Sequence, residues 1–375
     1  MRLLFVSYPL YGHVNPMLPL ALAARAAGHE VVFATGPDLG PELAAHGLAH
    51  WDAGPTHADV LAGHAPSPAM FTTGIAARAD DLLRQARARA WRPDVVVGDE
   101  FELAGSVVAA VLGARHVVHG LGLMPPAAIW RQLEPALTAL GDRHGIPDAT
   151  ERARAATYLE LAPPALRPPG ERVWDRAAPL RPVAVRPPDT PSGAPTEIDR
   201  LPRERTVHLT LGTLFHTRTE VLAAAIAGLR ELPVNLVVAS GPGSDPESFG
   251  PQPDHVLIRP YLPHARLLDR CALVVSQGGA GTFFAALARG IPQLLLPLGA
   301  DQFINADAGR RAGAVLTLTG TNATPDAIGA CARRLLAEPA FGAAADTLAR
   351  EIAAMPGPDD AVATVLAELT AGARQ

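Results

Sequence analysis

The sequence predicts an α/β protein with two successive doubly wound parallel sheets, and three observations lead there. Short apolar runs alternate with segments of helical spacing along most of the 375 residues. A proline-rich stretch interrupts this pattern near the middle of the chain. The length exceeds one average core and suits two domains of roughly 100–200 residues each. Because alternating strands and helices form parallel sheets covered on both faces, we expect two Rossmann-like domains.

The first domain is expected over residues 1–185. Its opening run, LLFVSY, predicts a strand, and NPMLPLALAARAAG predicts a helix with Asn15 as the N-cap, Pro16 as the first helical residue and Gly28 as the C-terminal cap. EVVFAT completes a β-α-β unit. The runs RPDVVVGDEF, ELAGSVVAAVLG and ARHVVHG then predict strand, helix and strand.

A linker rich in proline and charged residues is expected over residues 186–204, followed by a second domain over residues 205–356. There Thr217 and Glu220 have capping-box spacing before the helix EVLAAAIAGL. Strands are predicted at VHLTLG, NLVVAS, HVLIRP, ALVVSQ and PQLLLPL. Residues 357–375 predict a helix that packs back on the first domain. Since ligands of such sheets bind beyond the carboxyl ends of the strands, we expect the domains to face each other across a cleft.

Composition excludes several classes of function. The net charge of −5 and pI of about 6.2 give no basic surface for nucleic acid or an anionic membrane. The apolar runs are too short or too interrupted for a signal peptide or a membrane span, which predicts a cytoplasmic protein. The chain has no lysine, which excludes a Walker A site, a lysine Schiff base and a kinase. Its two cysteines lack metal or redox spacing.

Two glycine turns in the second half suit a diphosphate. Glycine lets the backbone approach a ligand closely, and a helix N-terminus favours an anion. A plain strand-to-helix turn that needs small residues remains the alternative at both places. The first turn supplies Gly212 and Thr213, and the second supplies Gln277, Gly279, Gly281 and Thr282.

Residues 259–305, RPYLPHARLLDRCALVVSQGGAGTFFAALARGIPQLLLPLGADQFIN, resemble the donor-binding signature of the GT-B nucleotide-sugar glycosyltransferases. The likeness is greatest to the bacterial branch that glycosylates antibiotics, macrolides included, and other natural products. The GGAGT core, GIPQLLLP and the ADQF-x-NA ending match in order and spacing. The amino-terminal GHVNPMLPLA is similar to that branch's acceptor-side signature. The resemblance is thin over residues 50–90 and 125–200, where the family's acceptor loops vary.

On the acceptor side, the resemblance implies that His13 is the general base that removes the proton of the acceptor hydroxyl, next to Gly12. A neutral imidazole with a pKa near 6.5 suits this transfer. Asp99 matches the carboxylate that orients the base, and Glu100 is the alternative beside the acceptor. Glu102 is expected to cap the next helix.

On the donor side, the resemblance implies that Asp301 and Gln302 hydrogen-bond hydroxyls of the transferred sugar. An N-cap role for Asp301 is the alternative. Tyr261 and Leu262 match the segment that packs on the nucleobase. The family usually has histidine where this chain has Gln277, whose amide can donate a hydrogen bond without bringing a positive charge. Arg259 or Arg266 would then compensate.

Taken together, the resemblance implies an inverting transfer of a sugar or deoxysugar from a TDP- or UDP-sugar to a hydroxyl of an apolar natural-product aglycone. It implies no cofactor and no required metal. An auxiliary nucleotide-sugar-binding protein without activity and a hexosamine 2-epimerase-like enzyme without an acceptor are the alternatives. No nucleic acid and no membrane is expected as a partner. The oligomeric state stays open, a homodimer included.

Overall fold

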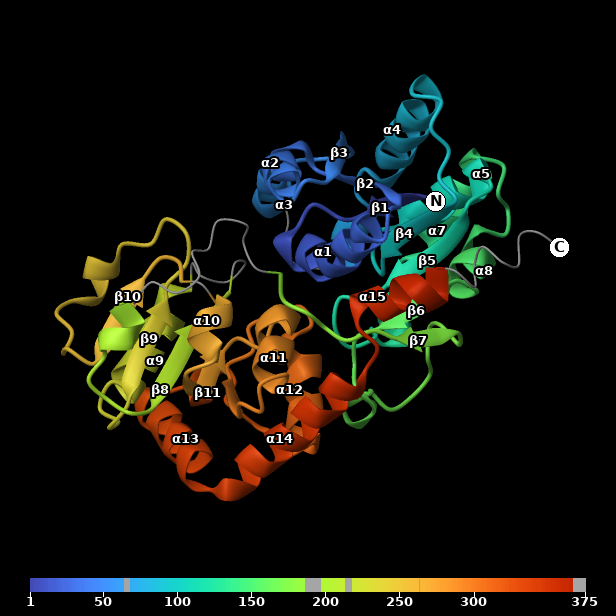
Figure 1. The fold of residues 1–375 in the computed structure, drawn as a ribbon. Coiled ribbons are helices and arrows are strands. Elements are labelled where there is room, and N and C mark those ends of the chain that lie inside the picture. The colour runs from blue at the N-terminus through green and yellow to red at the C-terminus, as the bar shows by residue number, and fades with distance from the viewer. Residues whose placement is uncertain (64–67, 186–196, 213–217, 263, 367–375) are drawn as a thin grey trace. The chain divides into compact units, whose positions relative to one another are not determined.

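The computed structural model describes residues 1–63, 68–185, 197–212, 218–262 and 264–366 (Figure 1). The chain divides into two compact units. Unit 1 comprises Met1–Ala162, Pro168–Pro188 and Met355–Gln375, and unit 2 comprises Pro163–Arg167 and Asp189–Ala354. Residues 186–196 of the predicted linker lie outside the described residues, as does Thr217 of the predicted capping box.

Within the described ranges, unit 1 contains a seven-stranded parallel sheet in the order β3-β2-β1-β4-β5-β6-β7. Its strands are β1 Arg2–Val6, β2 Glu30–Thr35, β3 Ala49–Asp52, β4 Val95–Asp99, β5 Arg115–His119, β6 Thr157–Glu160 and β7 Ala177–Pro179. Its helices are α1 Tyr11–Ala26, α2 Gly40–Ala45, α3 His57–Gly63, α4 Ile75–Ala88, α5 Leu103–Leu112, α6 Ala127–Trp130, α7 Glu134–Arg143, α8 Ala149–Arg154 and α15 Pro358–Ala361.

The two faces of this sheet bury alternate residues of each strand. Phe5 of β1 and Val97 of β4 pack with α1 and α15 on one face. Leu4 and Val96 pack with α4 and α5 on the other face. The chain therefore leaves β1 and β4, which are neighbours, toward opposite faces. This is the topological switch point of a doubly wound sheet, where ligands bind.

The first helix begins earlier than the sequence predicted. The structure starts α1 at Tyr11, with Leu10 as the N-cap, so the prediction of Asn15 as N-cap and Pro16 as the first helical residue was wrong. Val14 and Met17 are fully buried against the sheet, and this packing outweighs the signal of the proline. The other end is as predicted, because Gly28 follows the helix with a φ of +83°.

In the described part of unit 2, a six-stranded parallel sheet has the order β10-β9-β8-β11-β12-β13. Its strands are β8 Thr206–Thr210, β9 Asn235–Ala239, β10 Val256–Arg259, β11 Cys271–Ser276, β12 Gln293–Leu295 and β13 Val315–Thr317. Its helices are α9 Thr219–Leu229, α10 His264–Leu268, α11 Ala280–Leu287, α12 Gln302–Arg311, α13 Pro325–Ala337 and α14 Pro339–Ala354. Every strand predicted from the sequence is present.

Unit 2 has a switch point of its own, between β8 and β11. Leu209 and Val275 pack with α9 and α13 on one face. Val274 packs with Ala285 and Ala286 of α11 on the other face. The turns that follow β8 and β11 are therefore the expected ligand position in this unit.

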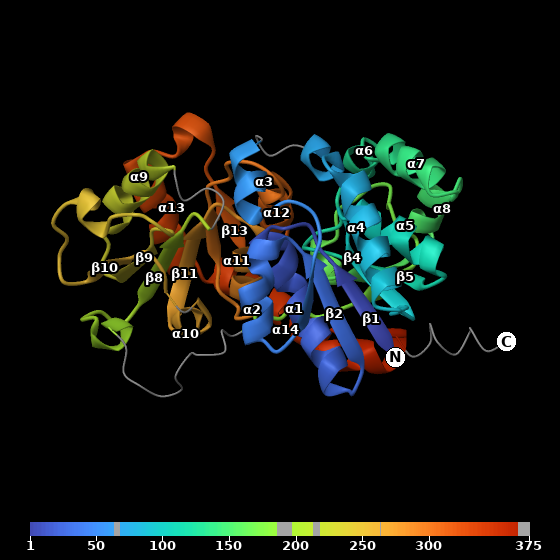
Figure 2. The ribbon, with the colours of Figure 1, turned by 90° about the horizontal axis from the view of Figure 1, so that it is seen from above.

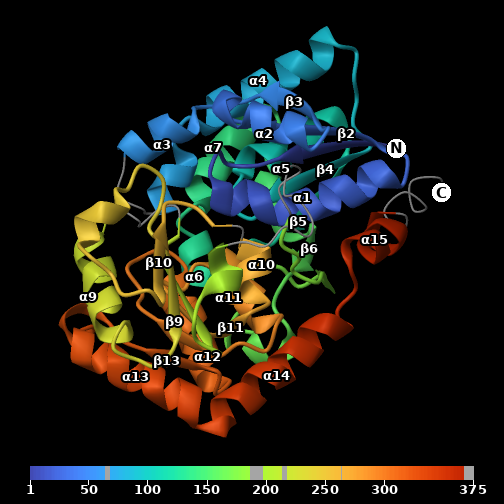
Figure 3. The same ribbon diagram turned by 60° about the vertical axis from the view of Figure 1, so that its left-hand side comes forward.

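The chain ends in unit 1. After α14, α15 lies beside α1 (Figure 3), and a π-helical turn, Val362–Leu366, follows it. Within the described residues, we find no helix with the length and apolar character that a membrane span needs.

Helices α9 and α13 lie side by side (Figure 2) and touch through two glycines. A Cβ on Gly228 would collide with the carbonyl oxygen of Pro325, and a Cβ on Gly329 would lie 2.7 Å from the carbonyl oxygen of Gly228. Backbone atoms cannot move aside as a flexible side chain does. The close approach of these helices therefore requires both glycines.

We predict that Gly228→Ala lowers the free energy of unfolding of unit 2 by about 1–3 kcal/mol, because the added methyl overpacks this crossing. Urea denaturation followed by circular dichroism measures the effect. Gly342→Ala in α14 is the matched control. A Cβ there meets nothing within 4 Å, so the better helix propensity of alanine should raise stability by up to about 1 kcal/mol. Equal effects of the two substitutions would contradict the prediction.

Candidate active site

The Asp99 carboxylate ends β4 at the switch point of unit 1, and its side chain is fully buried. Oδ2 accepts hydrogen bonds from Tyr8 N at 2.8 Å and Ser7 Oγ at 3.2 Å. Oδ1 accepts from Phe101 N at 2.8 Å. Burial by itself would raise the pKa of Asp99, but His13 and the two backbone donors outweigh it and hold the pKa below its ordinary value. The group is therefore ionised at neutral pH.

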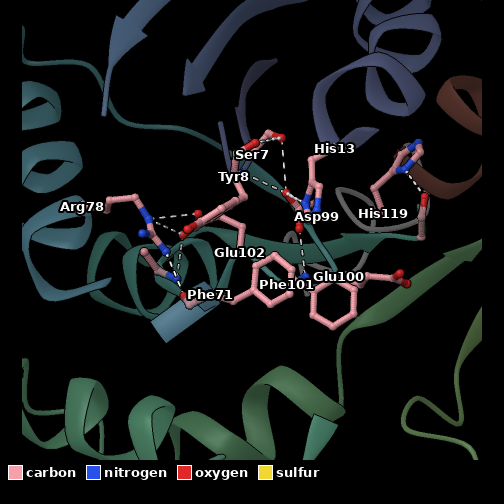
Figure 4. Close-up of polar contacts among 12 residues, drawn as sticks. Ser7, Tyr8, His13, Phe71, Arg78, Asp99, Glu100, Phe101, Glu102 and His119 are labelled. Atoms are coloured by element: carbon pink, nitrogen blue, oxygen red, sulfur yellow. Dashed lines mark hydrogen bonds and ion pairs between the residues drawn. The ribbon is translucent and has the colours of Figure 1, made fainter. Parts of the chain in front are cut away.

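His13 lies in the first turn of α1, where its backbone N donates to Leu10 O at 2.9 Å. Its Nδ1 is 3.2 Å from Asp99 Oδ2 (Figure 4), although the N–H is not aimed directly at the oxygen. About 10% of the side chain remains exposed. A carboxylate beside Nδ1 favours the proton on that nitrogen and leaves the lone pair on Nε2. The structure thus brings together the predicted base and its predicted partner.

Three aromatic rings surround His13. The ring centroids of Tyr8, Phe71 and Phe101 lie 5.8, 5.4 and 6.1 Å from that of His13. Phe71 and Phe101 stack on each other at 4.5 Å with an interplanar angle of 16° (Figure 4). Both rings are half-buried. The imidazole therefore lies between the Asp99 carboxylate and a group of aromatic rings.

A buried ion pair between Arg78 and Glu102 lies next to these aromatic residues. Arg78 Nε lies 3.1 Å from Glu102 Oε2, and neither side chain is more than 2% exposed. Arg78 also donates to the carbonyl oxygens of Phe71 and Thr73 at 3.2 and 2.8 Å. Glu102 is the N-cap of α5, as predicted, and accepts from Ala104 N. Burial raises the pKa of Glu102, which Arg78 partly offsets.

Two further polar side chains near Asp99 are buried. Glu100 accepts a 2.6 Å hydrogen bond from the Tyr158 hydroxyl, and its carboxylate points away from His13 (Figure 4). His119 pairs in register with Asp99 on β5, and its Nδ1 lies 2.7 Å from Gly120 O. Burial lowers the pKa of His119 to about 4. This imidazole is therefore neutral at pH 7.

At the switch point of unit 2, hydroxyl groups shape both turns. Thr210 Oγ1 accepts from Gly212 N, and Ser276 Oγ accepts from Gly278 N, each at 3.1 Å. Gly212 and Gly278 have φ values of +68° and +87°, which favour glycine. Thr213 lies outside the described residues.

Gln277 fills the space between the two turns. A Cβ on Gly212 would collide with Gln277 Nε2, and a Cβ on Gly279 would lie 2.9 Å from the same atom. The residue is only 6% exposed, and its Oε1 is buried and has no hydrogen-bond partner among the described residues. The structure thus brings Gln277, Gly212 and Gly279 together as predicted from the two glycine turns.

The helix after this turn begins at Ala280, two residues before Thr282. Asp301 accepts from Ala280 N at 3.2 Å and from Asn305 Nδ2 at 2.7 Å. Asp301 occupies the N-cap position of α12 but makes no capping hydrogen bond to the backbone of that helix. Its carboxylate accepts instead from the backbone N of Ala280, in the first turn of α11. Asn305 Nδ2 also donates to Gly278 O at 2.8 Å and so fixes the glycine turn.

The other predicted donor residues differ in exposure. Gln302 is 2% exposed, and its Oε1 accepts from Leu298 N and Gly299 N. Any ligand contact of this side chain would therefore come from Nε2. Tyr261 is 68% exposed, as suits a ring that stacks on a ligand. The remaining predicted residues are either half-buried (Leu262, Thr282) or exposed (Gly12, Gly281).

The residues that support the site were not predicted from the sequence. They are Ser7, Tyr8, Phe71, Arg78, Phe101, His119 and Asn305. Asn305 follows Asp301 by four residues on a helix, a spacing that could have indicated their contact. Within the described residues, no three His, Cys, Asp or Glu side chains gather as a metal site would require.

Comparisons with known proteins agree with these features. Residues 224–369 match the family model of erythromycin biosynthesis protein CIII-like C-terminal domains. The elloramycin glycosyltransferase ElmGT of Streptomyces olivaceus is 36% identical over 387 positions, which cover 97% of this chain and 96% of that protein.

Solved structures resemble the whole chain. The glycosyltransferase VinC in complex with dTDP has a TM-score of 0.80 at 27% identity and full coverage of both chains. The spinosyn rhamnosyltransferase SpnG, solved with thymidine diphosphate and with spinosyn aglycone, has a TM-score of 0.81 at 29% identity, over 97% of this chain and 100% of that chain. With the identity to ElmGT extending over nearly its whole length, the chain belongs to the GT-B glycosyltransferases of antibiotic biosynthesis.

Proposed function

We propose that the protein transfers a sugar or deoxysugar from a thymidine or uridine diphosphate sugar to a hydroxyl of an apolar aglycone, with inversion at the anomeric carbon. The observation that carries this proposal is the placement of His13 Nδ1 3.2 Å from the buried Asp99 carboxylate. The complexes of VinC with dTDP and of SpnG with thymidine diphosphate and an aglycone support the two substrate classes.

In this proposal His13 is the general base. Asp99 holds a proton on Nδ1, so Nε2 takes the proton of the acceptor hydroxyl as its oxygen attacks the anomeric carbon. The imidazolium that forms is stabilised by the carboxylate beside it. His119 cannot share this role near pH 7, because it is fully buried and its pKa is about 4.

The nucleoside diphosphate would be held by neutral groups of unit 2. The N-terminus of α11 has N–H groups without partners in the helix, and its dipole favours an anion. Gln277 adds an amide whose donor atom, Nε2, lies beside Gly212 and Gly279 of the two glycine turns, where it could donate to a diphosphate oxygen. We propose that these donors stabilise the leaving diphosphate with no metal required. Tyr261 would stack on the nucleobase, and Asp301 with Gln302 would bind the sugar.

We predict that His13→Ala lowers kcat by about 10²- to 10⁴-fold, because the acceptor hydroxyl loses its base. The variant should still bind thymidine diphosphate, measured as a rise in melting temperature, since His13 lies in the other unit. His46→Ala, a half-buried histidine after α2, is the matched control and should turn over normally. Normal turnover by His13→Ala would refute the base, and the absence of any nucleoside diphosphate binding by the wild type would refute the donor site.

We predict that Asp99→Asn lowers kcat by about 10²- to 10⁴-fold, because an amide cannot hold the proton on His13 Nδ1 or stabilise the imidazolium. It should also lower the free energy of unfolding near pH 7. A carboxyl whose pKa is lowered in the folded state stabilises above its unfolded pKa of about 3.9 and loses this effect as the pH falls through the folded value. The stability gap to the wild type should therefore narrow below about pH 4. A gap that is constant with pH would count against an ionised Asp99.

We predict that Gln277→His makes donor binding depend on pH. A protonated imidazole adds a charge-assisted hydrogen bond to the diphosphate, so the variant should bind thymidine diphosphate roughly 3- to 10-fold more tightly than the wild type near pH 5.5. The gain should vanish near pH 8. Isothermal titration at both pH values measures it, with Gln132→His on the surface of unit 1 as control. If the ratio of the variant's affinity to that of the wild type were the same at both pH values, Gln277 would not contact the diphosphate.

A further inference from the structure

We propose that Phe71 and Phe101 select the acceptor, forming an apolar wall beside His13 for a planar, aromatic ring system that carries the reacting hydroxyl. The inference rests on the proposed sugar transfer by His13 and names the class of acceptor that this site takes. Neither ring was singled out by the sequence, and Phe71 lies where the resemblance to the family is thin.

The two rings lie close to the imidazole that would receive the proton of the acceptor. Phe71 and Phe101 stack at 4.5 Å, and their centroids lie 5.4 and 6.1 Å from the imidazole. A hydroxyl that transfers its proton to His13 must come within hydrogen-bond distance of the imidazole. The carbon atoms that carry this hydroxyl then lie beside the phenyl rings, which remain partly exposed.

Planar acceptors gain more binding free energy from the Phe71 and Phe101 rings than acceptors with a puckered, saturated skeleton. Aromatic pairs attract each other in offset-stacked and edge-to-face arrangements beyond what buried apolar area provides. Because the two rings are nearly parallel, a planar polycycle can stack on the outer face of one ring or lie edge-to-face across the edges of both. A saturated skeleton of the same size gains only the buried area.

Both rings are held in place before an acceptor arrives. Arg78 donates to the carbonyl oxygens of Phe71 and Thr73, and the Tyr8 hydroxyl donates to Met70 O at 3.0 Å. Phe101 N donates to Asp99 Oδ1 at 2.8 Å. These bonds fix the backbone that carries the rings, and the rings pack on each other at 4.5 Å, so little conformational freedom is lost when an acceptor binds.

A purely shielding role is the competing explanation. The rings would then only exclude water from His13 and Asp99, and their loss would lower kcat for every acceptor by the same factor. Selection predicts a different result, a change in acceptor KM that depends on whether the acceptor is flat. The two roles are therefore separable by comparing acceptors.

The test uses Phe71→Leu and Phe101→Leu in the full chain, each of which keeps apolar volume and removes a flat face. Phe341→Leu, a half-buried ring of α14, is the matched control. The probes are a planar polycyclic phenol and a saturated polycyclic alcohol of similar size, assayed with a thymidine diphosphate sugar. Binding of each probe without donor is titrated as well, and a thermal melt shows that each variant is folded.

We expect either site variant to raise the KM and Kd of the planar phenol roughly 3- to 10-fold and to change those of the saturated alcohol less than about twofold. The donor KM should stay unchanged, any change in kcat should be the same for both probes, and the control should match the wild type. The proposal would be overturned if the KM and Kd of both probes rose by the same factor, or if neither variant raised the KM and Kd of the planar phenol. A wild-type protein that binds the phenol through these rings but transfers no sugar to it would instead refute the proposed function. Two independent variants keep the test decisive if one fails to fold.

Discussion

The candidate active site of unit 1 depends on one buried charge. Asp99 can stay ionised inside the protein only because donors surround it, from the end of β1, from α1 and from the turn after its own strand. A buried carboxylate without such partners would take up a proton instead. These donors are in place because β1 and β4 pair in parallel with Val6 opposite Gly98. The register of two strands thus fixes the charge that the proposed base requires.

Unit 2 has a similar sheet, but its expected ligand is a negatively charged diphosphate. The site therefore needs hydrogen-bond donors and no buried carboxylate. Ser276 shapes the turn, Gln277 fills it, and Asn305 fixes its backbone. Asp301 is the acidic residue here, and its contacts with Ala280 N and Asn305 tie α12 to α11. Neutral groups on a helix N-terminus suit a diphosphate that must arrive and leave in every turnover.

The sequence was informative where local pattern determines structure. The run EVVFAT forms β2 over those same six residues, and the glycine turns follow their strands as predicted. The contact between His13 and Asp99 was predicted from the resemblance to a family and not from local pattern. The start of α1 was missed because the burial of Val14 and Met17 is a tertiary effect that no local signal carries. Phe71 and Arg78 were missed for a similar reason. Their partners lie more than 20 residues away, at Phe101 and Glu102.

The pair of Arg78 and Glu102 indicates how the proposed acceptor selection by Phe71 and Phe101 can be separate from the proposed base. A buried ion pair contributes little net stability compared with apolar packing, but removing one partner alone costs about 3–5 kcal/mol. This pair therefore acts chiefly by fixing geometry, since Arg78 holds the backbone of Phe71 and Thr73 while Glu102 caps α5. Asp99 has its own donors and does not rely on Arg78. Substitution of Phe71 or Phe101 can therefore alter which acceptor binds while the contact between His13 and Asp99 stays intact.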